Sequence, residues 1–303
     1  MTHSHQTSRP YAWEGVLVVF CFLLLLIGLN LALGLLQAAI GPIPLSPVLI
    51  IGELILLVVV GIWSVWRRFP WRETFLLQPT IWRMIGLSIL VALLWWPVIT
   101  ALATLLEQLF SLIGPPPEIP PPQGVADSIG YFIAIVILAP LCEEPVFRGF
   151  IMRGWSRYGV VAAVVGSGIL FGLQHAQLNA LIPLSLAGLI IGFVALRAGS
   201  LWPAVAYHAV HNGLSAPFLL FPERLPEISD MTLIVAGGVS LPLAMVGLWF
   251  FHRYAPPQQM VEPETITSQH LIAIIVSSLL VAGVLFVLLA LEVFIRLNPE
   301  MAG

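Results

Sequence analysis

Residues 138–150 read Leu-Ala-Pro-Leu-Cys-Glu-Glu-Pro-Val-Phe-Arg-Gly-Phe, which places Glu143, Glu144 and Arg148 in a segment otherwise apolar enough to cross a bilayer. On insertion scales each charge at the bilayer centre costs roughly 2.5–3.5 kcal/mol, so three close together carry a large penalty. Arg148 follows Glu144 by four residues, and this spacing predicts an ion pair on one helix face. Glu143 then lacks a charged partner in its own helix, and an intramembrane carboxylate without such a partner indicates a functional role.

The composition is that of a membrane protein. Of 303 residues, 59% are hydrophobic and 9% are charged, whereas soluble domains carry about 25% charged residues. The mean hydropathy is +1.00, and the net charge of −3 argues against a nucleic-acid partner. Cys21 and Cys142 both lie in apolar segments, so we expect no disulfide framework. Cys142 adjoins Glu143 and is interpreted either as packing or as part of a site.

The apolar segments predict an all-α fold, a polytopic transmembrane helical bundle with an eight-helix body and one extra C-terminal span. The nine spans are expected at residues 14–37, 47–66, 83–110, 128–157, 160–178, 182–197, 201–221, 231–251 and 270–294. The Pro-rich segment 114–123 cannot be helical and is interpreted as a connecting loop, with a lid over the site as the alternative.

The arginines indicate how the helices are oriented, since the chain has no lysine. With the N-terminus inside, ten arginines fall at inner helix ends, and only Arg224 and Arg296 fall at outer ends. Leaving out Arg148, which the apolar segment could bury, the ratio is still nine to two. This bias predicts a cytoplasmic N-terminus and an outside C-terminus. The lack of lysine and the short inner loops suggest a bacterial plasma-membrane protein.

Polar residues recur at bilayer depth in three further spans. His175 lies in the fifth span, while His208 and Asn212 share one face of the seventh, four residues apart. Glu53, in the second span, is interpreted as structural, either paired with another polar residue or close to the outer surface. A carboxylate can take a proton from water, an imidazole can share it or bind a metal, and an amide can stabilise an oxyanion. The set favours hydrolytic chemistry, although polar transporter cores can look similar.

Two prolines interrupt the helix that carries Glu143. Pro140 and Pro145 have no amide proton, so α-helical spacing predicts that the carbonyls of Val136 and Leu141 lose their partners. Such gaps persist in a membrane only where protein or water satisfies the carbonyls. We therefore expect a water-holding cavity beside Glu143.

The polar residues form three motifs in chain order, namely Glu143-Glu144-x-x-x-Arg148, Phe171-x-x-x-His175 and His208-x-x-x-Asn212. These motifs resemble those of the CPBP intramembrane proteases. That family, also called Abi or CAAX protease-like, includes the type II CAAX prenyl endopeptidases. The resemblance covers about residues 128–222, and the Phe-Arg-Gly sequence after the glutamate pair fits the family pattern as well.

The resemblance implies an active cavity inside the membrane, in which a carboxylate and imidazole activate water for attack on a peptide bond. It implies these roles: Glu143 as the base, His175 assisting it, His208 and Asn212 stabilising the oxyanion, Glu144 and Arg148 holding the scaffold, and Phe171 packing against the site. Direct attack by water is expected, because no serine or cysteine is paired convincingly with a base.

Metal dependence stays open at this point. Glu143, His175 and His208 could form a zinc site with an open water position. The chain has no His-Glu-x-x-His motif, however, and the same groups can work without a metal, which is the mechanism we favour. No other cofactor is expected.

The expected organisation has three parts: N-terminal helices and the Pro-rich loop at 1–127, a CAAX protease-like core at 128–222, and C-terminal helices at 223–303. Expected partners are a membrane protein or lipidated peptide as substrate and the surrounding membrane lipids. Two other functions stay open. One is a non-catalytic membrane-complex subunit or immunity protein that binds through the same cavity. The other is a transporter or channel.

Overall fold

The computed structural model describes residues 9–117, 121–256 and 263–301, and these residues form helices with no strand. Part of the predicted Pro-rich loop, residues 118–120, lies outside the described residues, as do residues 1–8, 257–262 and 302–303. The long helices are α1 (Ala12–Ile40), α2 (Leu45–Arg67), α4 (Trp82–Phe110), α8 (Val160–Leu173), α9 (Leu181–Ala198), α10 (Trp202–Leu220), α11 (Asp230–Tyr254), α12 (Ser268–Leu297) and a continuous helical stretch from α5 (Gly124–Phe132) to α7 (Met152–Trp155). These elements correspond to the nine predicted spans, so the all-α prediction is confirmed.

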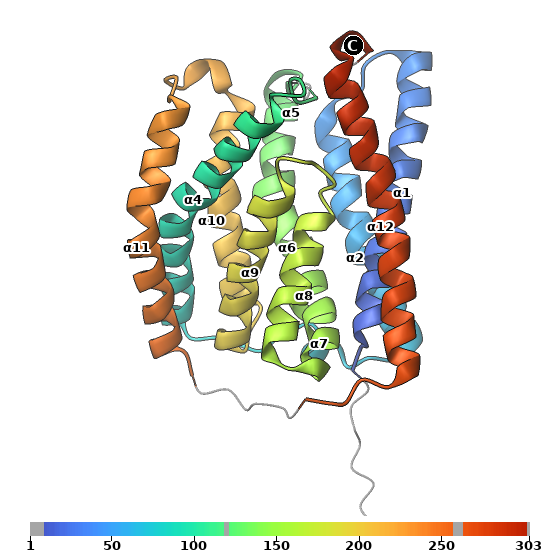
Figure 1. Cartoon of the computed structure of the whole chain (residues 1–303), viewed down its shortest axis with the longest axis vertical. Helices are drawn as coiled ribbons and strands as arrows, with labels where there is room; N and C mark the ends of the chain where they lie inside the picture. The colour runs from blue at the N-terminus through green and yellow to red at the C-terminus, as the bar shows by residue number, and fades with distance from the viewer. Residues whose placement is uncertain (1–8, 118–120, 257–262, 302–303) are drawn as a thin grey trace, which may run out of the picture.

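Hydropathy and length separate two helices from the others. Seven of the helical segments are long and apolar enough to cross a membrane. The remaining two are α8, with only 14 residues, and α10, which carries His208 and Asn212. In Figure 1 both lie between α11 on one side and α1 and α12 on the other. The chain is thus a multi-pass helical membrane protein.

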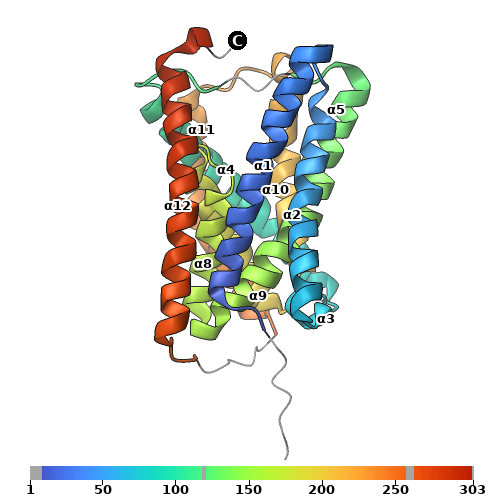
Figure 2. The same ribbon diagram turned by 90° about the vertical axis from the view of Figure 1, so that its right-hand side faces the viewer.

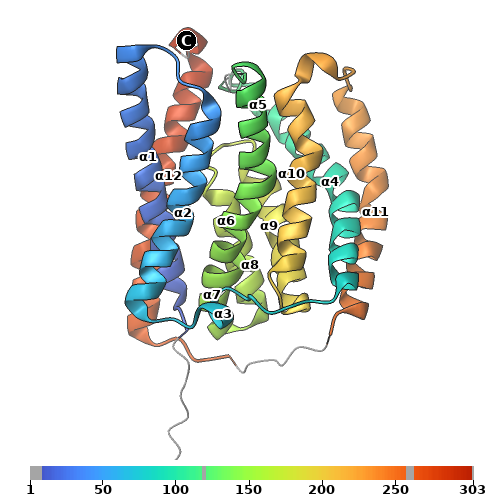
Figure 3. The ribbon, with the colours of Figure 1, turned by 180° about the vertical axis from the view of Figure 1, so that it is seen from behind.

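The helices run side by side and roughly parallel to one long axis (Figure 1). The view from behind shows α4, α10 and α11 on one side and α1, α2 and α12 on the other, with the stretch from α5 to α7 between them (Figure 3). The described chain begins at the lower end and finishes at the upper end, as an odd number of crossings requires. The cytoplasmic position of the N-terminus stays a prediction.

The ninth helix belongs to the bundle. Helix α12 packs against α1, and Figure 2 shows that the two are closest near their lower ends and diverge toward the top. Its upper part carries two charged side chains that are almost fully buried, Glu292 with 8% of its surface exposed and Arg296 with 1%. The extra C-terminal span predicted from the sequence therefore inserts charges into the protein instead of facing lipid alone.

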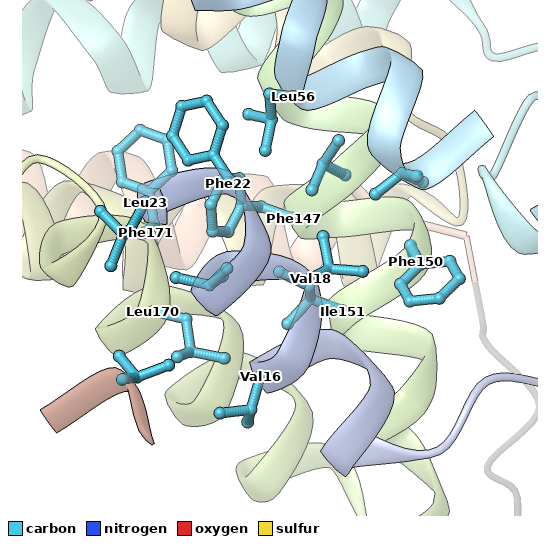
Figure 4. Packing of buried hydrophobic residues seen from close by; sticks show 14 of the residues in the cluster. Val16, Val18, Phe22, Leu23, Leu56, Phe147, Phe150, Ile151, Leu170 and Phe171 are labelled. Carbon is cyan, nitrogen blue, oxygen red and sulfur yellow. The ribbon is translucent and has the colours of Figure 1, made fainter. Parts of the chain in front are cut away.

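Two buried apolar clusters hold the elements around the site. One joins α1, α2 and α8 to the helical segment at 145–151, and Figure 4 shows its side chains meeting from these separate elements. The other joins α4, α9, α10 and α11. The helix that carries the glutamate pair lies between the two clusters, which fixes its position from both sides.

Candidate active site

The helix that carries the glutamate pair is distorted on both sides of the pair. A π-helical segment, η1 (Ile133–Leu138), precedes α6 (Ala139–Glu144), and a second, η2 (Pro145–Ile151), follows it. π turns inside α-helices are frequent at functional sites, where they change which side chains face a neighbour. Here Pro140 and Pro145 stand at or next to the start of α6 and η2, where an amide proton would otherwise be needed.

Asn212 compensates for the missing amide of Pro140. Its side-chain Nδ2 donates a hydrogen bond of 2.7 Å to the carbonyl of Ile135, five residues before the proline. In a π-helix that carbonyl would accept from the amide five residues on. The sequence prediction named Val136 because it assumed α-helical spacing, whereas the π-helical register places the carbonyl of Ile135 opposite Pro140. Asn212 therefore has a structural task as well as the oxyanion role proposed from the motif, and one hydrogen of its amide is already used.

Glu144 and Arg148 form the predicted ion pair. Arg148 Nε lies 3.1 Å from Glu144 Oε2, and neither side chain has any exposed surface. The N–H does not point at the oxygen well enough for a hydrogen bond, so the contact is electrostatic. The guanidinium lies 4.6 Å from the centre of the Phe171 ring, a cation–π arrangement that partly replaces lost solvation. Phe171 thus packs against the site, as predicted.

Glu144 also contacts the seventh span. Its Oε1 lies 2.8 Å from Nδ1 of His208. Because a carboxylate only accepts hydrogen bonds, Nδ1 carries the proton and the second ring nitrogen faces the other way. Glu144 therefore joins Arg148 to His208, a link between two motifs that their sequence positions did not reveal.

Glu143 is 93% buried and meets two side chains from other helices. Gln174 Nε2 donates to its Oε1 at 3.1 Å, and Nε2 of His208 lies 3.8 Å from its Oε2. That Oε2 has no hydrogen-bond partner among the described residues, which leaves it able to accept from a water molecule. The cavity expected beside Glu143 stays a prediction.

Gln174 is the site residue that sequence reasoning missed. It lies inside the Phe171–His175 motif, and its signal was an amide at bilayer depth directly before the histidine. A buried amide needs partners for its polar atoms, and a carboxylate in the neighbouring span is such a partner.

His175 does not contact Glu143 in the described structure. Helix α8 ends at Leu173, five residues earlier than expected, so His175 lies in the turn that follows. Its Nδ1 bonds the carbonyl of Phe171 at 2.9 Å, which leaves Nε2 with a lone pair. The Phe171 ring centre is 5.3 Å from that of His175 and 5.5 Å from that of His208. The two imidazoles therefore flank one aromatic ring, and the assistance of Glu143 by His175 stays a prediction.

Close packing of α8 on α9 sets the position of this turn. A Cβ on Gly188 would stand 2.7 Å from the carbonyl oxygen of Gly168, and one on Gly168 would stand 2.7 Å from the amide nitrogen of Leu189. Small residues let membrane helices approach closely enough for backbone contact. The short α8 is thus held against α9, which leaves Gln174 beside Glu143.

The three residues that could have formed a zinc site, Glu143, His175 and His208, do not form a ligand cluster. Within the described residues, no three histidine, cysteine or acidic side chains gather closely enough to hold a metal ion. Glu143 and His208 approach each other, and the bonds at Nδ1 leave the Nε2 atoms of His175 and His208 with lone pairs, but the three side chains do not gather around one point. As they lie, Glu143, His175 and His208 do not fit a three-ligand zinc site, so no step is derived through a metal.

These observations define a class: a polytopic helical membrane protein with an acid–histidine–amide cluster enclosed at the centre of its bundle. Residues 125–214 match the family model described as Rce1-like, type II CAAX prenyl endopeptidase Rce1-like. This match supports the resemblance to the CAAX protease-like family that the three motifs predicted. Searches of curated proteins and of solved structures found no match for the chain.

Proposed function

We propose that the protein is an intramembrane endopeptidase that hydrolyses a peptide bond of a membrane protein or lipidated peptide. The observation that supports this most is the state of Glu143. Its Oε1 is bound to Gln174, while its buried Oε2 faces His208 without a hydrogen-bond partner in the described part of the chain. A carboxylate oxygen held in this way can act as a general base toward water.

The proton movements follow from this geometry. Glu143 takes a proton from water, and the hydroxide formed attacks the carbonyl carbon of the scissile bond. The carbonyl π electrons move to the oxygen and give a tetrahedral oxyanion. When the carbon–nitrogen bond breaks, the leaving amine takes the proton from Glu143. The carboxylate is restored, and the elements of one water molecule have been added across the bond.

Two groups are proposed to stabilise the oxyanion. His208 donates through Nε2 only as an imidazolium, and the carboxylate of Glu144 at its Nδ1 stabilises that charged form, as the buried acid does in serine proteases. Asn212 keeps the second hydrogen of the amide that binds Ile135. In a site shielded from water such donors contribute more than they would in solution.

The test is cleavage of membrane peptides by the purified protein in liposomes. Glu143→Gln keeps the shape of the side chain but cannot take a proton, so we expect kcat to fall by about 10²–10⁴. Cys142→Ala is the matched control, because Cys142 is the buried neighbour of Glu143 and the nearby thiol. If Cys142→Ala abolished cleavage and Glu143→Gln did not, the glutamate mechanism would be wrong.

The binding and transport functions have their own outcomes. If a Glu143→Ala, His175→Ala double variant retained normal cellular function, this would establish a binding role. Ion flux across liposomes that contain the wild-type protein would support a channel. Metal analysis of the purified protein, beside cleavage with and without a chelator, tests the metal-free mechanism that we propose. The cytoplasmic N-terminus is tested by labelling single cysteines introduced at the two ends of the bundle.

A further inference from the structure

The turn that carries Gln174 and His175 continues as an irregular segment, residues 174–180, between α8 and α9. Figure 1 shows this connection well below the upper ends of α1, α11 and α12. Backbone without helical hydrogen bonds at membrane depth is tolerated only where protein or enclosed water satisfies its polar groups. The partners of this segment therefore matter for the conformation of the site.

One backbone amide of the segment is bound by the last helix. The amide nitrogen of Leu178 donates to Oε2 of Glu292 at 2.9 Å. The other oxygen of Glu292 accepts from Nε of Arg296 at 3.0 Å. Glu292 thus uses both oxygens, one on the segment beside the site and one on its own helix.

A second anchor reaches the next residue from a different helix. Asn179 Nδ2 donates to Oε2 of Glu107, on α4, at 2.7 Å. Arg296 lies between the two acids and contacts Oε1 of Glu107 at 3.1 Å. Two consecutive residues of the segment are therefore tied to one partly buried network that α12 completes.

The backbone of the segment is strained next to His175. Ala176 has a φ of +48°, in the left-handed region that side chains other than glycine rarely adopt. Strain of this kind persists only when surrounding contacts over-determine the conformation. The anchors at Leu178 and Asn179 follow Ala176 by two and three residues and supply such contacts.

We propose that α12 is a positioning element for the site: Glu292 and Arg296 hold residues 174–180 in the strained conformation that presents Gln174 to Glu143 and places His175 beside Phe171. The proposal rests on the proposed function for its effect on catalysis. It also explains why a helix that otherwise resembles a lipid-facing span carries two charges, which are costly in a bilayer unless they are paired inside the protein.

The experiment compares Glu292→Ala with Glu264→Ala in the full-length protein. Glu264, which lies just before α12, pairs with Arg157 at 2.9 Å. Glu264→Ala therefore also removes an acid that forms an ion pair, but at the end of α12 away from residues 174–180. We expect Glu292→Ala to lower kcat by about 10- to 100-fold, because a displacement of catalytic groups by about 1 Å or less reduces the rate by up to that amount. KM should change by less than about twofold, and Glu264→Ala should match wild type.

Hydrogen–deuterium exchange of residues 174–180 gives a readout that does not depend on cleavage. Faster exchange there in Glu292→Ala, with α11 unchanged, supports the anchoring even if the wild type proves not to be a protease. Unchanged exchange overturns the proposal, as does an unchanged kcat in a cleaving enzyme. If Glu292→Ala does not fold, Asn179→Ala removes the other anchor alone and is held to the same two readouts.

Discussion

Replacing Arg148 with methionine tests whether the buried charge network stabilises the bundle. Arg148 has no exposed surface and lies 3.1 Å from the equally buried Glu144. Removing one partner of a buried pair leaves an uncompensated charge and costs about 3–5 kcal/mol. Methionine also loses the cation–π contact with Phe171, whose ring centre is 4.6 Å from the guanidinium. We expect the free energy of unfolding of Arg148→Met to fall by about 3–5 kcal/mol.

The assay is reversible unfolding of the purified protein in mixed micelles, followed by circular dichroism. Because about 1.4 kcal/mol is a factor of ten, the predicted loss corresponds to roughly 10²–10⁴ in the folding equilibrium. Arg224→Met is the control. Arg224 and Glu223 lie 3.6 Å apart with side chains 75% and 68% exposed, and an exposed pair contributes about 0–1 kcal/mol.

A second variant separates the charge effect from lost packing. In Arg148→Met, Glu144→Gln the unpaired carboxylate is replaced by a neutral amide, so the double variant should be more stable than Arg148→Met alone. The reasoning is refuted if Arg148→Met loses no more stability than Arg224→Met. It is also refuted if the two substitutions simply add.

Three further variants probe single contacts. Asn212→Leu leaves the carbonyl of Ile135 without its partner and should destabilise the protein by about 1–3 kcal/mol in the same unfolding assay. Gly188→Val places methyl groups where α8 and α9 touch, and overpacking should cost about 1–3 kcal/mol. Gln174→Leu removes a hydrogen bond to the carboxylate of Glu143, which is worth about 1.5–3 kcal/mol, so cleavage should slow by about 10- to 150-fold.

Each of these variants has a control or an opposing result. Gly28→Val adds the same side chain at a glycine whose Cβ would meet nothing within 4 Å, so equal losses at Gly28 and Gly188 would contradict the close-packing argument. Wild-type stability in Asn212→Leu would show that another group satisfies the carbonyl. Unchanged cleavage by Gln174→Leu would show that Gln174 does not contribute to catalysis.

The distorted fourth helix shows where sequence reasoning stopped. The two prolines predicted unpaired carbonyls beside the glutamates, and Asn212 was singled out for its motif position. The pairing of Asn212 with Ile135 depends on a π turn that shifts the hydrogen-bond register by one residue. Local proline chemistry predicts a defect in the helix, but which neighbouring side chain repairs it depends on how two distant helices pack.

The end of the fifth span is a second feature that local sequence did not predict. Its apolar run predicted a helix to residue 178, but α8 ends at Leu173 because the following residues bind α4 and α12 instead of continuing the helix. No local pattern marks this end, since the competing partners lie more than seventy residues away along the chain. Because α8 ends there, Gln174 lies in the turn and donates its hydrogen bond to Glu143.

The sequence by itself determined the class of protein, the number of helices and the three motifs, because long apolar runs and charges within them have only a few favourable states in a bilayer. It also predicted the Glu144–Arg148 pair, which depends only on helical spacing. Only the tertiary structure decided that Glu144 also binds His208, that Gln174 contacts Glu143 and that the last helix anchors the turn after His175. These contacts join segments far apart in the chain, and burial in a medium without water makes each polar group take whichever partner the packing supplies.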